Sequence, residues 1–177
     1  MTLKGLLLAL FIVFTGVSPA QGQFSLWLVE KKLDIKYSVP NITHQELSEK
    51  LASKDADRYV LFDVREKEEY AVSHLASAHR VDPGTNAEAF VKAFGTMIRG
   101  KNLVFYCSVG DRSSYLIEKI QGQALEAGAL SLSNLRGGIF RWYNENHPVV
   151  NASGATDTVH PYDEEWGKLI EKRNRKQ

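Results

Sequence analysis

The chain has 177 residues, which is enough for one domain with a hydrophobic core of its own. Its formal net charge is +1, which excludes a general electrostatic attraction to nucleic acid or to a membrane surface. Cys107 is the single cysteine, which excludes a disulfide bond within the chain.

The amino terminus has the pattern of a secretory signal peptide. Lys4 precedes an apolar stretch over residues 6–17, which is short for a membrane span, and small residues follow up to Ala20. We predict a signal peptide over residues 1–20 and an exported, periplasmic protein. Cleavage after Gly22 and retention of the segment as a membrane anchor are the alternatives.

An N-terminal extension is predicted over residues 24–40. Its apolar residues Leu33, Ile35, Tyr37 and Val39 alternate with polar ones, which predicts a half-exposed strand. This strand would lie ahead of the main domain.

The main domain, over residues 41–150, alternates strand patterns with helix patterns. Thr43 and Thr85 each stand three residues before a glutamate, the capping-box pattern that begins a helix. Continuous apolar runs predict buried strands over residues 59–62 and 103–106. Further predicted elements are a helix from Ser113, a strand over residues 129–135 and a helix from Gly137. The alternation predicts a three-layer α/β domain with a mostly parallel central sheet flanked by helices.

Cys107 begins the loop between the strand over residues 103–106 and the helix from Ser113. Backbone N–H groups of such a loop and the positive end of the following helix favour an anion at the sulfur, and Arg112 adds a positive charge. These effects favour the thiolate, which is the form of cysteine that attacks. Gly110 lets the loop turn tightly. The pattern therefore favours a nucleophile over a buried structural thiol.

Further motifs stand in a fixed order before and after the Cys107 loop. They are Asp63-Val64-Arg65 with Glu69-Tyr70 and Ser73-His74-Leu75, then Cys107 to Ser113, then Gly137-Gly138 followed by Trp142. Together they resemble the single-domain rhodaneses, a family of sulfurtransferases. The chain departs from the family pattern at Ser73, where glycine is usual, and at Ala76-Ser77, where Pro-Gly is common.

The resemblance implies a sulfurtransferase in which Cys107 is the catalytic residue and carries a persulfide. It implies thiosulfate or a persulfide as the sulfur donor, and a thiol or cyanide as the acceptor. The substrate-binding residues would be Ser108, Val109, Gly110, Asp111, Arg112 and Ser113, while Asp63 and Arg65 would be a structural signature. Arg112 would either hold the persulfide or face outward and brace the loop, and we favour a mixed role.

Other functions compete with this one. A rhodanese-like fold also serves as a non-catalytic binding module. A phosphatase needs a longer loop between cysteine and arginine than residues 108–111 provide, and a thiol oxidoreductase needs a second cysteine. The histidines lack ligand spacing, so we expect no metal. The low net charge leads us to expect neither nucleic acid nor a stable membrane partner. We also expect no cofactor.

Residues 151–177 are predicted to form a connector and a tail helix around residues 163–173. His160, Tyr162 and Trp166 are expected to fold this tail onto the domain. The sequence leaves open whether the tail covers the active site.

Overall fold

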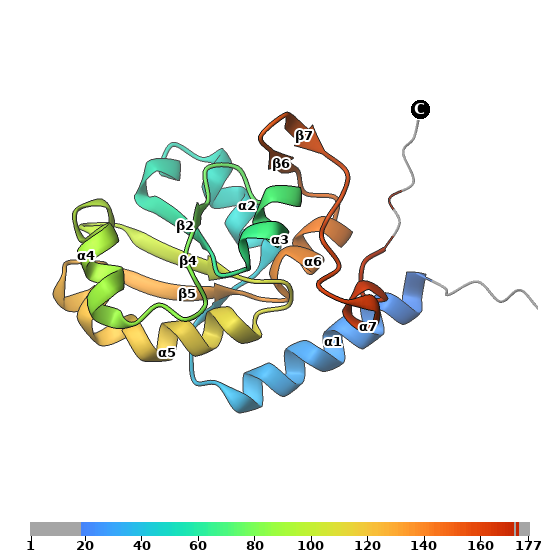
Figure 1. Cartoon of the computed structure of the whole chain (residues 1–177), viewed down its shortest axis with the longest axis horizontal. Helices are drawn as coiled ribbons and strands as arrows, with labels where there is room; N and C mark the ends of the chain where they lie inside the picture. Colours follow the sequence, from blue (N-terminus) through green and yellow to red (C-terminus); the bar gives the residue numbers. More distant parts are fainter. Residues whose placement is uncertain (1–18, 172, 174–177) are drawn as a thin grey trace, which may run out of the picture.

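The computed structural model describes residues 19–171 and residue 173 (Figure 1). The predicted signal peptide, residues 1–20, falls almost entirely outside the described residues. Within them, no helix is both long enough and apolar enough to cross a membrane.

A central sheet of parallel strands organises the domain, as predicted. Its order is β1-β5-β4-β2-β3, and every neighbouring pair is parallel. The strands are β1 (Asn41–Ile42), β2 (Tyr59–Asp63), β3 (His79–Arg80), β4 (Asn102–Tyr106) and β5 (Ser131–Leu135). The short edge strand β1 was not predicted, whereas a short strand was expected next to Arg80, where β3 lies.

Helices cover both faces of the sheet, which confirms the three-layer α/β fold (Figure 1). They are α2 (His44–Ala52), α3 (Lys67–Val72), α4 (Ala87–Ile98), α5 (Asp111–Glu126) and α6 (Gly138–Asn144), with a short 3-10 helix, η1 (Ala56–Arg58). Along β4, Leu103 and Phe105 pack with α4 and α5, whereas Val104 and Tyr106 pack with α2 and α6. A strand buried on both faces in this way needs a continuous apolar run.

One of the two predicted capping boxes is confirmed. The Glu46 N–H donates to Thr43 Oγ1 at 3.2 Å, and the Thr43 N–H donates to Glu46 Oε2 at 2.9 Å. The box at Thr85 is wrong, because α4 is capped by Asn86, whose Oδ1 accepts from the Ala89 N–H at 2.8 Å. Asparagine caps a helix at least as well as threonine, so the helix begins one residue later.

The strand predicted in the N-terminal extension is wrong. The helix α1 (Pro19–Lys36) extends through Leu33 and Ile35. Leu26, Glu30 and Leu33 face the protein at helical spacing, and Ile35 is 88% exposed on the other side. Burial of this face of α1 against the domain outweighs the short alternating pattern at the end of the helix.

The C-terminal part also differs from the prediction. Residues expected to be a connector form an antiparallel hairpin, β6 (Val149–Asn151) and β7 (Gly154–Thr156). The tail helix α7 (Glu164–Gly167) is much shorter than predicted. After it the chain turns inward and buries Leu169, whose carbonyl accepts from Asn144 Nδ2 at 2.8 Å. These tertiary contacts replace further helical turns.

Candidate active site

Cys107 directly follows β4, at the carboxyl end of a central strand. Its side chain is 1% exposed, and the Gly110 N–H donates to its Sγ at 3.2 Å. Gly110 has φ 108° and caps α5, a conformation that disfavours other residues. A Cβ there would also approach Asn134 Nδ2 to 3.0 Å. Glycine therefore allows the loop to bring a backbone donor to the sulfur.

The first turn of α6 holds the same loop from behind. The Ile139 N–H donates to the Cys107 carbonyl at 2.9 Å, and the Phe140 N–H donates to the Ser108 carbonyl at 3.0 Å. Gly138 has φ 56°, and a Cβ on it would collide with both carbonyl oxygens. The Gly137-Gly138 motif thus lets a helix end approach the active-site loop closely.

Arg112 forms a bidentate ion pair with Glu69 of α3. Its Nη1 donates to Glu69 Oε2 at 2.6 Å, and its Nη2 donates to Glu69 Oε1 at 2.9 Å. Nη2 also donates to Ser108 Oγ at 3.0 Å, and this hydroxyl in turn donates to Glu69 Oε1. Arg112 therefore braces the loop, and its guanidinium also lies close enough to the Cys107 sulfur to interact with it.

The charges in this network stabilise one another. Burial raises the pKa of Glu69, but the Arg112 guanidinium and the Glu66 N–H outweigh burial and hold that pKa below its usual value. Burial lowers the pKa of Arg112, but its bonds to Glu69 and the nearby Cys107 sulfur outweigh burial and raise that pKa. Both groups are ionised at neutral pH.

Asp63 and Arg65 form a second pair, which lies inside the protein. Arg65 donates from Nε and Nη2 to the two carboxylate oxygens of Asp63, at 2.9 and 2.7 Å. Nη2 also donates to the Ser73 carbonyl at 2.5 Å. Both side chains are 0% exposed, and neither lines the pocket at Cys107.

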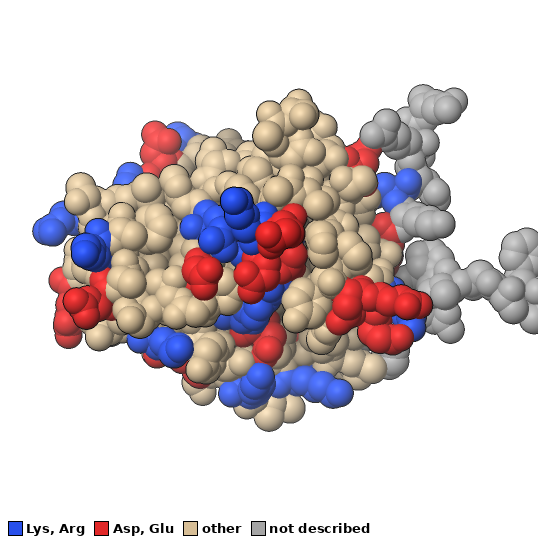
Figure 2. Space-filling view, viewed as in Figure 1, with Lys and Arg blue, Asp and Glu red and all other residues tan. Residues whose placement is uncertain are grey.

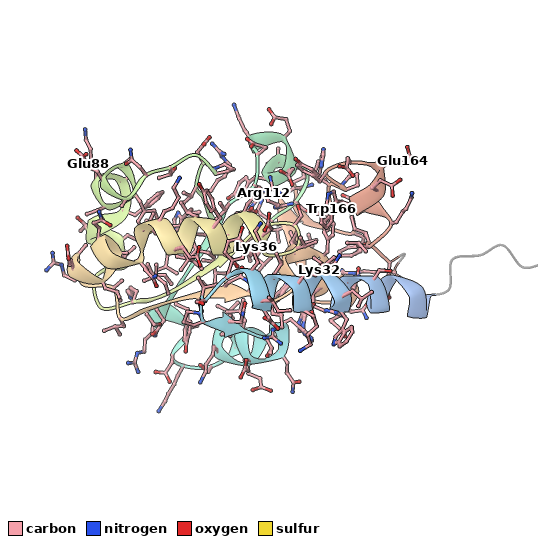
Figure 3. The ribbon with its side chains drawn as sticks, turned by 90° about the horizontal axis from the view of Figure 1, so that it is seen from below. Lys32, Lys36, Glu88, Arg112, Glu164 and Trp166 are labelled. Atoms are coloured by element: carbon pink, nitrogen blue, oxygen red, sulfur yellow. The ribbon has the colours of Figure 1, made fainter. Side chains whose placement is uncertain are left out.

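The pocket at Cys107 has a volume of about 140 Å³. Its lining consists of Cys107, Ser108, Val109, Asp111, Arg112, Tyr162 and Trp166. Figure 3 shows Arg112 and Trp166 close together beside the first turn of α5, with Lys36 approaching from the end of α1.

Most of the predicted binding residues meet at this pocket. Ser108, Val109, Asp111 and Arg112 line it, and Gly110 contributes its N–H group. Ser113 does not line it, because its hydroxyl is buried and donates to Asn134 Oδ1 at 2.7 Å.

The sequence reasoning missed several residues of the site. Glu69 stood in a quoted motif without a role, although it holds Arg112. Tyr162 and Trp166 were expected to pack the tail onto the domain, and whether the tail covers the active site was left open. Asp111 is held by Lys36 Nζ at 2.7 Å and by the Tyr37 hydroxyl at 2.9 Å, which joins the end of α1 to the loop. No local sequence pattern predicts these pairings between distant segments.

The charges around the site are mixed in sign. Figure 2 shows acidic and basic side chains interspersed at the centre of this face of the molecule, with a larger acidic group over α7 at its right. Across the described part of the chain, no group of three or more histidine, cysteine or acidic residues could hold a metal ion.

A family model for the rhodanese-like domain matches residues 43–145, more than half of the chain. The chain belongs to the rhodanese-like domain family. The match extends from the cap of α2 to the end of α6 and includes Cys107 and Arg112, which agrees with the resemblance found in the sequence. The C-terminal residues Tyr162 and Trp166 lie outside it.

Two curated proteins are similar to part of the chain. One is a tRNA sulfurtransferase of Thermoplasma volcanium, 27% identical over 114 residues, and the match covers 59% of this chain and 22% of that protein. The other is an uncharacterized protein of Synechocystis, 26% identical over 111 residues, with 60% of this chain and 55% of that protein covered. The chain thus spans about a fifth and about half of these relatives.

Solved structures agree with the fold. The As-Sb reductase from Leishmania major superposes with a TM-score of 0.55 at 18% identity, covering 62% of this chain and 79% of that one. A protein from Bacillus halodurans superposes with a TM-score of 0.52 at 19% identity, covering 81% of this chain and 97% of that one. At these identities the likeness establishes the fold alone.

Proposed function

We propose that this rhodanese-like protein is a sulfurtransferase that carries sulfur as a persulfide on Cys107. The observation that carries the proposal is the Cys107 sulfur in the lining of a pocket, with the Gly110 N–H 3.2 Å from Sγ. A fixed N–H donor aimed at Sγ stabilises the Cys107 thiolate, which is both the attacking form and the form released when an acceptor takes the outer sulfur. The tRNA sulfurtransferase among its relatives supports the same reaction class.

The reaction would proceed in two half-reactions. The Cys107 thiolate attacks the outer sulfur of thiosulfate, the new S–S bond forms, and sulfite leaves with the electron pair of the broken bond. With a persulfide donor, the leaving group is the donor's thiolate. An acceptor thiolate or cyanide then attacks the terminal sulfur and releases the Cys107 thiolate. No metal or cofactor takes part in these steps.

The charges around the pocket bear on the choice of donor. Arg112 is neutralised by Glu69, and Asp111 adds a negative charge that Lys36 balances. The site therefore offers little net positive charge to a dianion. This balance supports a neutral or monoanionic donor over thiosulfate, and a cellular thiol as the physiological acceptor.

The intact mass of the protein tests the proposal directly. Reduced wild-type protein and Cys107→Ser are incubated with thiosulfate or glutathione persulfide, and each is then treated with cyanide. We expect wild type to gain the mass of one sulfur atom and to lose it to cyanide, while the serine variant gains nothing. Absence of a gain from either donor contradicts the proposal.

A non-catalytic binding module is the second candidate, and one observation favours it. Cys107 is 1% exposed, so a donor reaches the sulfur only through the pocket. Under this candidate, Cys107→Ser retains the protein's binding to its partner and wild type remains free of added sulfur. The mass measurement therefore separates the two functions.

We further propose that the protein acts in the periplasm. The support is the sequence of residues 1–20, with Lys4 and the apolar stretch after it. Amino-terminal sequencing of the protein recovered from the periplasm would give Gln21 as the first residue if cleavage follows Ala20. Recovery of the full chain in the cytoplasm contradicts this location.

A further inference from the structure

We propose that the strap, residues 157–171, forms a selecting wall of the Cys107 pocket and makes it prefer sulfur donors that carry an apolar group. The inference rests on the proposed function and names the class of donor. Tyr162 and Trp166 of the strap line the pocket together with Cys107. Both lie beyond residue 145, where the rhodanese-like domain ends. This wall therefore lies outside the residues that the family model matches.

The strap is anchored to the protein on both sides of its aromatic residues. The Tyr143 hydroxyl donates to the Asp157 carbonyl at 2.7 Å. Beyond α7, Asn144 Nδ2 donates to the Leu169 carbonyl at 2.8 Å, and Asn144 Oδ1 accepts from the Glu171 N–H at 3.0 Å. Tyr143 and Asn144 belong to α6, the helix whose first turn holds the Cys107 loop. Loop and strap are thus positioned by the same helix.

The aromatic side chains of the strap are placed by local bonds. Trp166 lies in the first turn of α7, where its backbone N–H donates to Asp163 Oδ1 at 2.9 Å. Tyr162 adopts φ 68°, unusual for a residue with a Cβ, and its N–H donates to His160 Nδ1 at 3.0 Å. The centroid of its ring lies 5.0 Å from the Arg112 guanidinium carbon, a cation–π contact. These contacts direct the two rings to the pocket.

The same contacts leave apolar surface as the main means of recognition. Arg112 donates to Glu69 and Ser108 and lies near the Cys107 sulfur, and one face of its guanidinium lies against Tyr162. Val109 and Trp166 add apolar surface to the lining. A phenyl or alkyl group beside the donor's sulfur would bury area against these side chains, whereas a small, strongly hydrated dianion would not.

A pair of thiosulfonates isolates this preference. Benzenethiosulfonate and methanethiosulfonate carry the same single charge and react alike. In both, the Cys107 thiolate bonds to the outer sulfur, the bond from that sulfur to the sulfonyl sulfur breaks, and a sulfinate leaves with the electron pair. They differ in the group that the aromatic wall would contact, so the ratio of their kcat/KM values reports on the wall.

We would measure this ratio, with cyanide as the acceptor, in wild type, Trp166→Ala and Trp27→Ala. Trp27 is a tryptophan of α1 that is 46% exposed and does not line the pocket, so it is the matched control. We expect Trp166→Ala to lower the preference for the phenyl donor about tenfold, because it removes the apolar area that the ring would bury. Trp27→Ala should keep the wild-type ratio. An unchanged ratio in Trp166→Ala overturns the inference.

Two further variants protect the test from misfolding and from failure of the proposed function. If Trp166→Ala folds poorly, Trp166→Phe serves in its place. This variant retains an aromatic side chain, so it should keep most of the wild-type ratio. If wild type accepts sulfur from no donor, the proposed function fails, and the wall is then tested by binding alone. Benzenesulfinate should bind Cys107→Ser more tightly than methanesulfinate does, and adding Trp166→Ala should remove the difference. Equal binding of the two sulfinates overturns the inference independently of catalysis.

Discussion

Two arginine–carboxylate pairs lie near the carboxyl ends of β2 and β4, and they differ in what surrounds them. Asp63 and Arg65 are both 0% exposed and have protein on every side. In the other pair, Glu69 is 3% exposed but Arg112 is 23% exposed at the pocket. The same chemical pairing therefore stabilises the fold in one place and shapes the electrostatics of a site in the other.

The comparison shows that exposure, more than residue type, decides the role of such a pair. A fully buried pair cannot meet a substrate, and loss of one partner leaves an uncompensated charge in the protein. A pair open to a pocket can change the charge that a substrate meets. Three predictions separate these roles, and they run from the largest expected effect to the smallest.

Arg65→Leu should have the largest effect, on stability. It leaves the carboxylate of Asp63 buried without its cation, which should lower the free energy of unfolding by about 3–5 kcal/mol. Urea unfolding followed by circular dichroism measures the change. Arg58→Leu is the control, because Arg58 is 61% exposed in a 3.8 Å pair with Asp55, and its loss should cost at most about 1 kcal/mol. Similar losses in the two variants would contradict the assignment of Arg65 to the fold.

Glu69→Gln should act on both stability and donor choice. The amide cannot accept all the hydrogen bonds that the carboxylate accepts, so we expect a loss of about 1–3 kcal/mol in the free energy of unfolding. The variant also leaves the charge of Arg112 unneutralised. The kcat/KM for thiosulfate should rise about fivefold, because a dianion gains more than a monoanion from one added positive charge.

The matched control for this substitution is Glu68→Gln, which removes the same charge from an exposed neighbouring position of α3. It should change neither stability nor the kcat/KM for thiosulfate appreciably. A fall in thiosulfate turnover in Glu69→Gln would show that Glu69 acts by positioning Arg112 rather than by masking its charge.

The smallest effect concerns pH. The pKa of Glu69 in the folded protein lies below its usual value of 4.5, because the bonds from Arg112 and the Glu66 N–H outweigh burial. Its pairing therefore contributes fully to stability above that usual value and is lost as pH falls through the lower folded value. Urea unfolding of wild type and Glu69→Gln across this range should show the difference in stability narrowing at acidic pH. A constant difference would mean that the ionisation of Glu69 does not contribute.

Features set by neighbouring residues were predictable from the sequence. The continuous apolar runs predicted β2 and β4, and the pattern Thr43-x-x-Glu46 predicted the start of α2. Cys107 was placed at a strand end because a continuous apolar run precedes it and a helical pattern follows it. Each of these features depends on residues a few positions apart, so the local sequence contains the information.

Contacts between distant segments could not be predicted from the sequence. The sequence determined a thiol in a strand-to-helix loop within a parallel α/β domain, because periodicity and backbone sterics act locally. Only the tertiary structure decided that Glu69 binds Arg112 and that Trp166 reaches the pocket, since these pairs are separated by long stretches of chain. It also decided that residues 33–36 are helical, because burial of one face of α1 against the domain outweighs a short alternating pattern.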